Sequence, residues 1–587
     1  MSKYICYTVK AIIIFAGISL YLFKMDPWLC WNFISHMFIL FGAFALLRNY
    51  HSGSERAAVF SRVLAALFAA MMVIGQNIYN NNDLSGILGS FSGFAENTVK
   101  FSGFFLLYYF LFIRLFAWLE NASFTPRRNK ERGFFTCNKK SFFLQWGVIF
   151  IMWLPCLLAY WPGTLPYDAP WQVRQSLNFS DMNMHHPIIH TAFIGIFYRI
   201  SLAFGNDELL PITYAFGQMI IMSAIFSFVV YYMAKIRLPS WLRFLALAFF
   251  ALYPFIVIFS IVMSKDPLHG GAVCLFFISL LDAALDAEAF FKSKKKMLLF
   301  LVTGFLFTIT RNNAYYAFII CIPVFLVFFR RYWHIAIVLF VAVATFTQHY
   351  NGFLTTVLHV WKGPAVERYP LIAQQFAHVV LKHEDNLSQK DLSDIYNFLP
   401  REAINEYHPR YADPVKNRLN EENVRDTAKL ITTWLRIGIK HPICYTSAFL
   451  SNGMGFWYID SHINDPIIMR RYIETSFNTD FDPVFERKSK IPFLMQKYEN
   501  FAWFIEDITR APVLVTFMSV AFPFWLLIVT GAILIFKKSR LWITLVPLAA
   551  LLFTVIIGPL AYGRYIYPIV ALYPMIFGLM LIEGQNK

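Results

Sequence analysis

Residues Ile188–Phe204 read IIHTAFIGIFYRISLAF, and the placement of this stretch decides how the rest of the chain is threaded through a membrane. The stretch is apolar enough to cross, although it contains His190 and Arg199. A crossing would move every later loop to the other side and would put four basic segments outside the cell. Basic loops favour the cytoplasmic face. The charge pattern therefore predicts that this stretch lies along the outer membrane interface. The four segments are 235–243, 292–296, 330–333 and 537–540.

The composition is that of a membrane protein. The chain has 587 residues, of which 58% are hydrophobic, 19% are aromatic and 15% are charged. Soluble domains carry about 25% charged residues, so a large soluble enzyme is excluded. The net charge of +16 falls mostly in short loops between apolar runs. It therefore indicates orientation rather than a nucleic-acid partner, and we expect membrane lipids to surround the chain.

Apolar runs of about twenty residues, long enough to cross a hydrocarbon layer of about 30 Å, recur along the chain. They predict an all-α polytopic membrane protein with about 14 transmembrane helices, and the first run lacks a cleavage site and is expected to be retained. With a cytoplasmic N-terminus, the C-terminus and the basic loops also lie on the cytoplasmic side of the membrane, which we expect to be the cytoplasmic membrane of a bacterium. A re-entrant hairpin is an alternative to two spans for residues 297–310 and 313–330, because the polar stretch TRNNAYY lies at the turn between them. The predicted spans are 5–23, 28–47, 57–77, 98–119, 142–161, 210–233, 241–263, 267–290, 297–310, 313–330, 334–353, 512–535, 541–560 and 566–584.

Four regions follow from this threading. Residues 1–141 form a four-helix membrane region, 142–353 a membrane core with an outward loop at 162–187, and 512–587 the last transmembrane helices. The segment 354–511 is too long for a connection, so we expect a mainly helical domain outside the membrane, with interfacial helices. Its aromatic run Phe456, Trp457 and Tyr458 suits either a sugar-stacking platform or a membrane-interface belt.

The outward loop carries the first group of candidate site residues. Asp168 follows PGTLPY, and Gln172 and Arg174 come shortly after it. An alternative role for Asp168 is the N-cap of a short helix. Next comes the pair His185 and His186 before a proline. No third ligand stands at a recognisable spacing from this pair, and the seven cysteines include no CxxC motif, so neither a metal site nor a cofactor is indicated.

Three further polar groups fall on the same outward face. They are SKDP with Lys265 and Asp266, TRNN with Arg311 and Asn312, and YGRYIYP with Arg564 and Tyr565. Ionisable side chains at a membrane boundary are costly to place, so their convergence indicates a functional site. A lipid-linked sugar phosphate would fit it. The cations would hold the developing phosphate charge, and a carboxylate would take the proton of the acceptor hydroxyl.

The order of these elements (PG…D…Q, HHP, KD, RNN and GRYxxP) resembles the polyprenyl-phosphate-dependent C-type glycosyltransferase superfamily (GT-C, dolichyl-phosphate-mannose mannosyltransferase-like), in particular a bacterial branch of it. The resemblance covers roughly residues 142–584. It implies a shared core of spans with two juxtamembrane helices, Asp168 as the catalytic base and Asp266 as a second catalytic acid. Two departures stand out: four extra spans precede the core, and the loop has a single acid where the family has an adjacent pair, which makes a divalent metal doubtful.

We therefore expect a glycosyltransferase that moves a sugar from a polyprenyl-phosphate donor to an envelope glycan or lipid acceptor on the outer face of the cytoplasmic membrane. A transporter or flippase of lipid-linked oligosaccharides is one alternative, although it predicts acids buried in mid-span. A polymerase or ligase is the other. The residues expected to bind substrate are Lys265, Arg311, Asn312, Arg564, Tyr565, His185, His186, Gln172 and Arg174.

Overall fold

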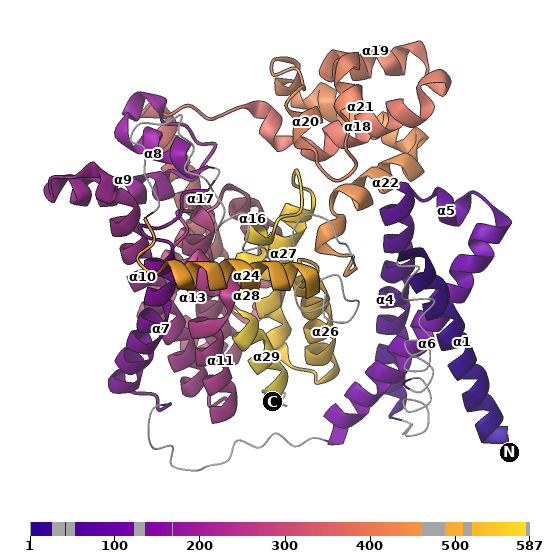
Figure 1. Ribbon diagram of the computed structural model, residues 1–587, viewed down its shortest axis with the longest axis horizontal. Coiled ribbons are helices and arrows are strands. Elements are labelled where there is room, and N and C mark those ends of the chain that lie inside the picture. The colour runs from indigo at the N-terminus through magenta and orange to yellow at the C-terminus, as the bar shows by residue number, and fades with distance from the viewer. Residues whose placement is uncertain are drawn as a thin grey trace.

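A computed structural model describes residues 2–25, 42, 53–121, 135–166, 168–460, 488–508 and 519–582. In these described ranges the secondary structure is helical, and β-type pairing is limited to four isolated bridges. Figure 1 shows most long helices running in one general direction, with a smaller group of helices above one end of the bundle. The all-α architecture predicted from the apolar runs is confirmed.

Six described helical segments are long and apolar enough to cross a membrane, and the bent pair α28 (Gly563–Val570) and α29 (Tyr573–Leu581), with a 42° angle between its halves, makes a seventh. A polytopic membrane protein is thus supported, whereas the number fourteen stays a prediction. The predicted span 28–47 lies outside the described residues apart from Gly42. The six are α4 (Glu55–Asn81), α6 (Phe91–Asn121), α7 (Lys139–Ala159), α10 (Leu210–Lys235), α13 (Lys265–Leu285) and η3 with α17 (Arg330–Tyr332 and Trp333–Thr356).

The first helices form a group at one side of the molecule (Figure 1). Helix α1 (Ser2–Met25) and helix α4 both pack on α6. A Cβ atom added at Gly17 would lie 2.8 Å from Cα of Gly103, so α1 and α6 cross at two small residues, as membrane helices often do. Lys100 is buried here, where it pairs with Glu96 at 2.6 Å and donates to Gln76 at 2.8 Å.

The remaining membrane helices share one apolar core, which joins residues 149–343 to the C-terminal helices. The ring of Phe255, for example, lies 5.6 Å from that of Tyr567. The C-terminal helices thus complete the bundle begun by α7. Its other members are α11 (Ser240–Leu252), α12 (Pro254–Phe259), α14 (Ala287–Phe291), α15 (Lys294–Ile309), α16 (Asn312–Phe328), α26 (Phe522–Phe536), η9 (Arg540–Leu545) and α27 (Val546–Ile556).

Two ion pairs fix α15 alongside α13. Near the first turn of α15, Lys296 lies 3.7 Å from Asp282 in the last turn of α13. Just past its other end, Arg311 lies 2.7 Å from Asp266 in the first turn of α13. Helix α15 therefore extends over nearly the same depth as the candidate span α13, which argues against the re-entrant alternative for the α15–α16 pair.

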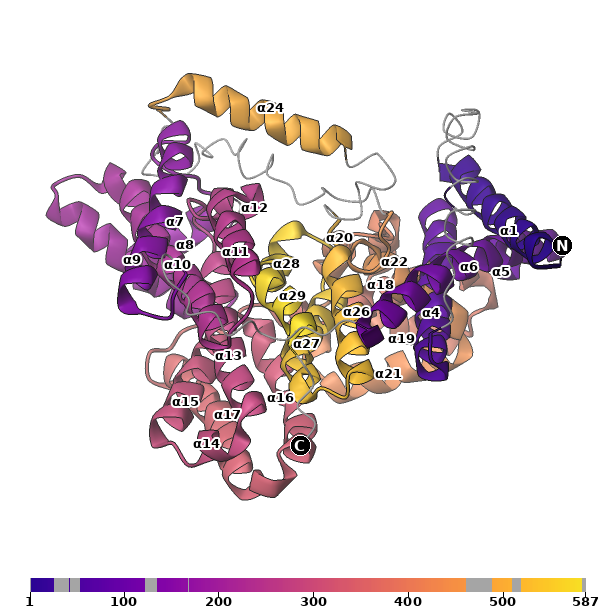
Figure 2. The same cartoon turned by 90° about the horizontal axis from the view of Figure 1, so that it is seen from below.

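Helix α9 (Ile188–Ala203) has 16 residues and lies across the direction of the long helices (Figure 1). This arrangement agrees with the interfacial placement predicted from the basic loops. Helix α24 (Pro492–Ile508) also runs across the bundle and lies along its flank (Figures 1 and 2). It is held at the end of α7 by a ring contact of 6.0 Å between Tyr160 and Tyr498. It exposes Phe493, Trp503 and Phe504, as an interfacial helix does.

The helices above the bundle have an apolar core of their own. This group, residues 365–452, also contacts the N-terminal helices: Lys382 pairs with Asp83 at 2.7 Å, and Arg410 donates to the carbonyl of Tyr79 at 2.6 Å. We call it the outward domain, after the side of the membrane that the charge pattern predicts for it. Its main helices are α18 (Pro370–His383), α19 (Gln389–Phe398), α20 (Asp413–Lys416), α21 (Thr427–Lys440) and α22 (Pro442–Asn452).

The aromatic run that follows α22 does not form an exposed surface. Phe456, Trp457 and Tyr458 are all buried. The indole N–H of Trp457 donates to the carbonyl of Leu450 at 3.2 Å, and Trp457 and Tyr458 pack in the core of the N-terminal helices. Both earlier interpretations of this run, the sugar-stacking platform and the membrane belt, are therefore wrong, because the rings hold two parts of the protein together.

Candidate functional site

Four side chains from distant parts of the sequence meet at the end of the bundle that faces the outward domain. The carboxylate oxygen Oδ2 of Asp168 lies 3.2 Å from Nζ of Lys265, 3.2 Å from a guanidinium nitrogen of Arg564 and 4.0 Å from Nδ1 of His186. Nζ of Lys265 also lies 3.0 Å from Nδ1 of His186. We call these four residues the Asp168 cluster. It contains two cations for one carboxylate.

The loop before Asp168 is attached to the loop before Lys265. The N–H of Met263 donates to the carbonyl of Thr164 at 2.9 Å, and the N–H of Thr164 donates to the carbonyl of Ile261 at 3.3 Å. Gly163 makes this approach possible, because residues with a side chain rarely adopt its φ of +134° and a Cβ atom would lie 3.2 Å from the carbonyl oxygen of Pro211. The short parallel pairing therefore brings Asp168 to Lys265.

Asp168 stands at the N-cap position of α8 (Ala169–Leu177), yet its side chain makes no capping hydrogen bond. The carboxylate reaches the two cations instead, and its exposed fraction is 30%. The alternative role of Asp168 as a helix cap is thus not realised by its side chain. A carboxylate placed at a helix start but turned toward two cations suggests chemistry or binding rather than helix stability.

Arg564 is positioned from the outward domain. The N–H of Ala412 donates to the carbonyl of Pro559 at 2.7 Å, and Tyr411 pairs with Leu560 in an antiparallel bridge. This pairing supports the loop that leads into α28. The guanidinium of Arg564 then lies 5.1 Å from the ring of Tyr565, a cation–π contact that restricts its orientation.

Four helices begin at this place. Asp168 precedes α8, Lys265 is the first residue of α13, Arg311 is the N-cap of α16, and Arg564 is the second residue of α28. The N-terminal ends of helices carry partial positive charge and unpaired N–H groups. The site therefore combines helix starts with cationic side chains, an environment that favours a bound anion.

Asp266 and Arg311 form a second, deeper pair at 2.7 Å, in which the Asp266 side chain is fully buried. The hydroxyl of Ser264 donates to the other carboxylate oxygen at 2.8 Å. The ring of Tyr565 lies 4.7 Å from the Arg311 guanidinium and thus contacts the cations of both pairs. With both carboxylate oxygens occupied, this geometry favours a positioning role for Asp266 over the catalytic role that the sequence resemblance implied.

The histidine loop is held from two sides. The side-chain amide of Asn312 donates to the carbonyls of Met184 and His185 at 2.9 and 3.1 Å, and the N–H of Met184 donates to the carbonyl of Trp361 at 2.8 Å. Asn312 thus positions this loop through its backbone. The rings of His185 and His186 lie 4.5 Å apart, and only that of His186 reaches Lys265.

Gln172 belongs to a buried polar network beneath the cluster. Its carbonyl oxygen contacts Nδ1 of His190 at 3.1 Å, and Nε2 of His190 contacts the hydroxyl of Tyr214 at 2.8 Å. The hydroxyl of Tyr214 donates to Gln218 at 3.0 Å, and the Gln218 amide donates to the carbonyl of Val262 at 3.0 Å. The network therefore braces the loop that carries Lys265.

Sequence reasoning missed Tyr214 and Gln218, although they are polar side chains four positions apart in an apolar helix. That spacing places them on one face and was a usable signal. Arg174, in contrast, is not part of the site. It is 57% exposed and pairs with Asp181 at 2.9 Å, so its predicted role in substrate binding has no support from its position.

The electrostatics of the cluster are asymmetric. Burial raises the pKa of Asp168, but Lys265 and Arg564 outweigh it and hold the pKa well below its usual range. Burial and the neighbouring Lys265 lower the pKa of His186 to about 2. At neutral pH the cluster therefore has an ionised Asp168 and a neutral His186, whose Nδ1 accepts the hydrogen bond from Lys265. Within the described residues, no group of three His, Cys, Asp or Glu side chains is arranged to hold a metal.

A family model matches residues 178–587, which include every residue of the Asp168 cluster except Asp168 itself. No curated protein and no solved structure matches this chain. The matched stretch covers more than half of the sequence, from the end of α8 through the outward domain to the last helix. The chain therefore belongs to the family described as "Family of unknown function (DUF6020)".

Proposed function

We propose that this protein is an integral-membrane glycosyltransferase that moves a sugar from a polyprenyl-phosphate donor to an envelope glycan or lipid acceptor at the outer face of the cytoplasmic membrane. The observation that carries the proposal is the carboxylate of Asp168 held at 3.2 Å from both Lys265 and Arg564. A general base beside two cations supplies both functions that transfer from a sugar phosphate needs.

The donor phosphate would take the place of the Asp168 carboxylate on the two cations. Lys265 and Arg564 are each 13% exposed, so an anion at this boundary can reach them. Arginine offers a planar fork for phosphate oxygens, and lysine offers a point charge. The four helix starts add to the same positive field.

This exchange would also activate the base. While Asp168 is paired with both cations, its pKa is well below the usual value of an aspartate, so the carboxylate is a weak base. Once the donor phosphate neutralises Lys265 and Arg564, the carboxylate is released and its pKa rises. Donor binding would therefore prepare Asp168 for the acceptor, which gives an ordered reaction with the donor first.

In the transfer step, the acceptor hydroxyl oxygen attacks the anomeric carbon of the donor sugar. The bond from that carbon to the phosphate oxygen breaks, and the polyprenyl phosphate leaves with the electron pair, held by Lys265 and Arg564. Asp168 takes the proton of the acceptor hydroxyl. His186 stays neutral and accepts the hydrogen bond from Lys265, so it orients the amine without adding charge.

The decisive experiment compares envelope glycans by mass spectrometry in cells that carry the parent gene, a deletion or Asp168→Asn. We expect the deletion and Asp168→Asn to lose the same sugar substituent, with the variant protein present at normal levels in the membrane. Asp181→Asn is the matched control, because Asp181 lies in the same loop and pairs only with the exposed Arg174 in the described contacts. It should leave the glycans unchanged.

The same cells separate the alternatives. A flippase would leave whole oligosaccharides on the inner leaflet, and a polymerase or ligase would change chain length or attachment instead of one substituent. Normal glycans in Asp168→Asn would overturn the proposal. Purified protein with a radiolabelled polyprenyl-phosphate sugar then gives the direct measure, with transfer in Asp168→Asn expected to fall by ~10²–10⁴-fold.

A further inference from the structure

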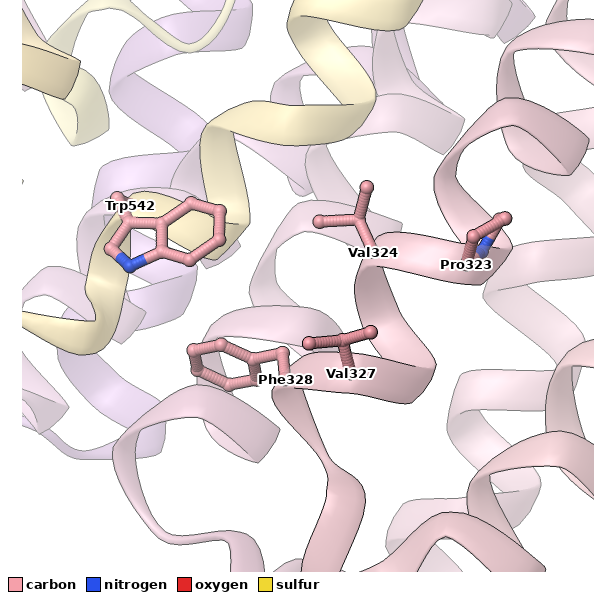
Figure 3. A pocket seen from close by; sticks show the side chains of 5 residues that line it. All are labelled: Pro323, Val324, Val327, Phe328 and Trp542. Atoms are coloured by element: carbon pink, nitrogen blue, oxygen red, sulfur yellow. The ribbon is translucent and has the colours of Figure 1, made fainter.

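A groove on the flank of the bundle is lined by apolar side chains alone. Pro323, Val324, Val327 and Phe328 of α16 face Trp542 of η9 across a cavity of about 350 Å³. Figure 3 shows the indole of Trp542 on one side and the four α16 side chains on the other. Val327 is 74% exposed, so the groove opens on the surface that a membrane helix presents to lipid.

The groove is far from the Asp168 cluster. Arg311 is the N-cap of α16, whereas Phe328 is its last residue. A helix of 17 residues is about 25 Å long, so the groove lies near the opposite membrane boundary. Trp542 and the nearby Tyr332 and Trp333 are residue types typical of a membrane-water interface. The groove is therefore not part of the proposed donor site.

Cations rim the apolar lining. The guanidinium of Arg540 lies 4.7 Å from the ring of Phe328 and donates to its backbone carbonyl at 3.4 Å. Arg330 and Arg331 follow Phe328 within η3, and both are exposed. An apolar floor with an arginine rim at one membrane boundary has the charge and polarity of an anionic phospholipid site.

Acidic residues close to this rim have other partners. Glu288, on the neighbouring α14, pairs with Lys292 at 2.5 Å. Asp286 caps the same helix by accepting from the N–H of Ala289 at 2.9 Å. Glu288 also interacts electrostatically with Arg331, so Arg540 and Arg330 are the arginines of the rim that a lipid phosphate can use. The charge complementarity argues against a zwitterionic lipid as the preferred occupant.

We propose that this groove binds one anionic phospholipid of the bilayer leaflet opposite the Asp168 cluster. An acyl chain would lie between Val324, Val327 and the Trp542 indole, and the phosphate would lie at Arg540 and Arg330. The proposal is independent of the glycosyltransferase assignment, because it uses none of the residues of the Asp168 cluster.

Native mass spectrometry of the full-length protein tests it, after exchange into vesicles or nanodiscs with equal amounts of phosphatidylglycerol and phosphatidylcholine. We expect the parent to retain phosphatidylglycerol about tenfold more than phosphatidylcholine. Arg540→Gln should bring the two close to parity. The matched control is Arg237→Gln, which removes an exposed arginine that follows α10; it should keep the parent's preference.

A second variant guards against a simple loss of folding. Val327→Trp fills the groove from an exposed position and should lower retention of both lipids while the protein stays folded. Equal retention of both lipids by the parent, or an unchanged preference in Arg540→Gln, would overturn the proposal. Displacement of phosphatidylglycerol by added polyprenyl phosphate would overturn it as well, because it would assign the groove to the donor chain.

Discussion

Asp168 and Arg564 are 396 positions apart in the sequence, and their side chains meet at 3.2 Å. One stands at the start of a short helix and the other at the start of the last bent pair of helices. The pair thus joins the start of α8 to the start of α28, at the place where Lys265 also lies. Because both side chains are partly exposed at this boundary, removing either one should affect binding and chemistry more than the fold.

Arg564→Ala should raise the KM for the polyprenyl-phosphate donor by ~10- to 100-fold, since a charge-assisted contact contributes about 1.5–3 kcal/mol. Arg564→Lys should recover only part of the loss, because an ammonium cannot make a bidentate contact. Steady-state transfer by the purified protein measures both. Arg199→Ala, an exposed arginine on α9, is the control, and a donor KM for Arg564→Ala equal to the parent's would reduce Arg564 to an interfacial anchor.

Gly163→Ala should lower transfer by displacing the loop that carries Asp168. The residue has a φ of +134°, and its added Cβ would crowd the carbonyl of Pro211. Strain of this kind costs ~1–3 kcal/mol. Gly205 is the matched control, because its φ of +76° is also positive but nothing lies within 4 Å of its Cβ position.

Specific activity and thermal unfolding of the two glycine variants separate loop displacement from general destabilisation. Gly205→Ala should lose a little stability and keep its activity per folded molecule, whereas Gly163→Ala should lose both. Equal activity in the two variants would contradict the proposed coupling between the 163–164 pairing and Asp168.

The sequence was sufficient to predict that the site residues lie at one end of the membrane helices. Asp168, Lys265, Arg311 and Arg564 all stand at the ends of apolar runs, and the basic loops assign those ends to one side. Which of these side chains contact one another could not be predicted, because those contacts depend on short backbone pairings such as that of Thr164 with Val262. Such pairings leave no periodic signal in the sequence.

Burial explains the other differences. Tyr and Trp suit both a membrane interface and a packed interior, so Tyr458 gave no sign that it would lie against the N-terminal helices. The role of Gln172 likewise depends on His190 from a later helix. Local sequence patterns record which side chains are polar, but the tertiary packing decides which of them face a substrate and which face one another.

The low pKa of His186 predicts a pH effect on stability. In the unfolded chain a histidine titrates near pH 6.5, whereas in the fold the pKa of His186 is about 2. Below pH 6.5 His186 binds a proton in the unfolded state, whereas it stays neutral in the folded state until the pH approaches 2. The associated stability is therefore complete above pH 6.5 and declines as the pH falls toward 2, by about 1.4 kcal/mol per pH unit at most.

His186→Gln removes this titration but keeps a hydrogen-bond acceptor for Lys265. Between pH 7 and pH 4 we expect the parent to lose more thermal stability than the variant, as measured by unfolding in detergent at each pH. His349→Gln, an exposed histidine on α17, should follow the parent. Parallel curves for the parent and His186→Gln would show that His186 titrates normally in the fold.

The interfacial placement of α9 predicts which loops are accessible from outside. Sixteen residues give a helix of about 24 Å, shorter than a hydrocarbon layer of about 30 Å. In a background whose native cysteines are replaced by serine, Lys390→Cys in the outward domain should react with an impermeant thiol reagent on intact cells. Arg237→Cys and Lys294→Cys should react only after permeabilisation, and their reaction from outside would reverse the threading.

Variants of the buried pair of Asp266 and Arg311 test whether Asp266 has a positioning role or a catalytic role. Asp266→Ala leaves a buried guanidinium without its carboxylate, and breaking such a pair costs about 3–5 kcal/mol. The double variant Asp266→Leu with Arg311→Met should recover much of this stability, because it removes both charges. Glu406→Gln, which opens the exposed pair with Arg418, should cost less than about 1 kcal/mol.

Asp266→Asn keeps the shape of the side chain and decides its role. If Asp266 only positions Arg311, the folded fraction of Asp266→Asn should keep its transfer activity within about tenfold of the parent at a temperature below unfolding. A catalytic carboxylate at this position would instead lose ~10²–10⁴-fold, as expected for Asp168→Asn. Because Ser264 and Arg311 occupy both carboxylate oxygens of Asp266, we expect the smaller effect, and a loss as large as that of Asp168→Asn would return Asp266 to the catalytic set.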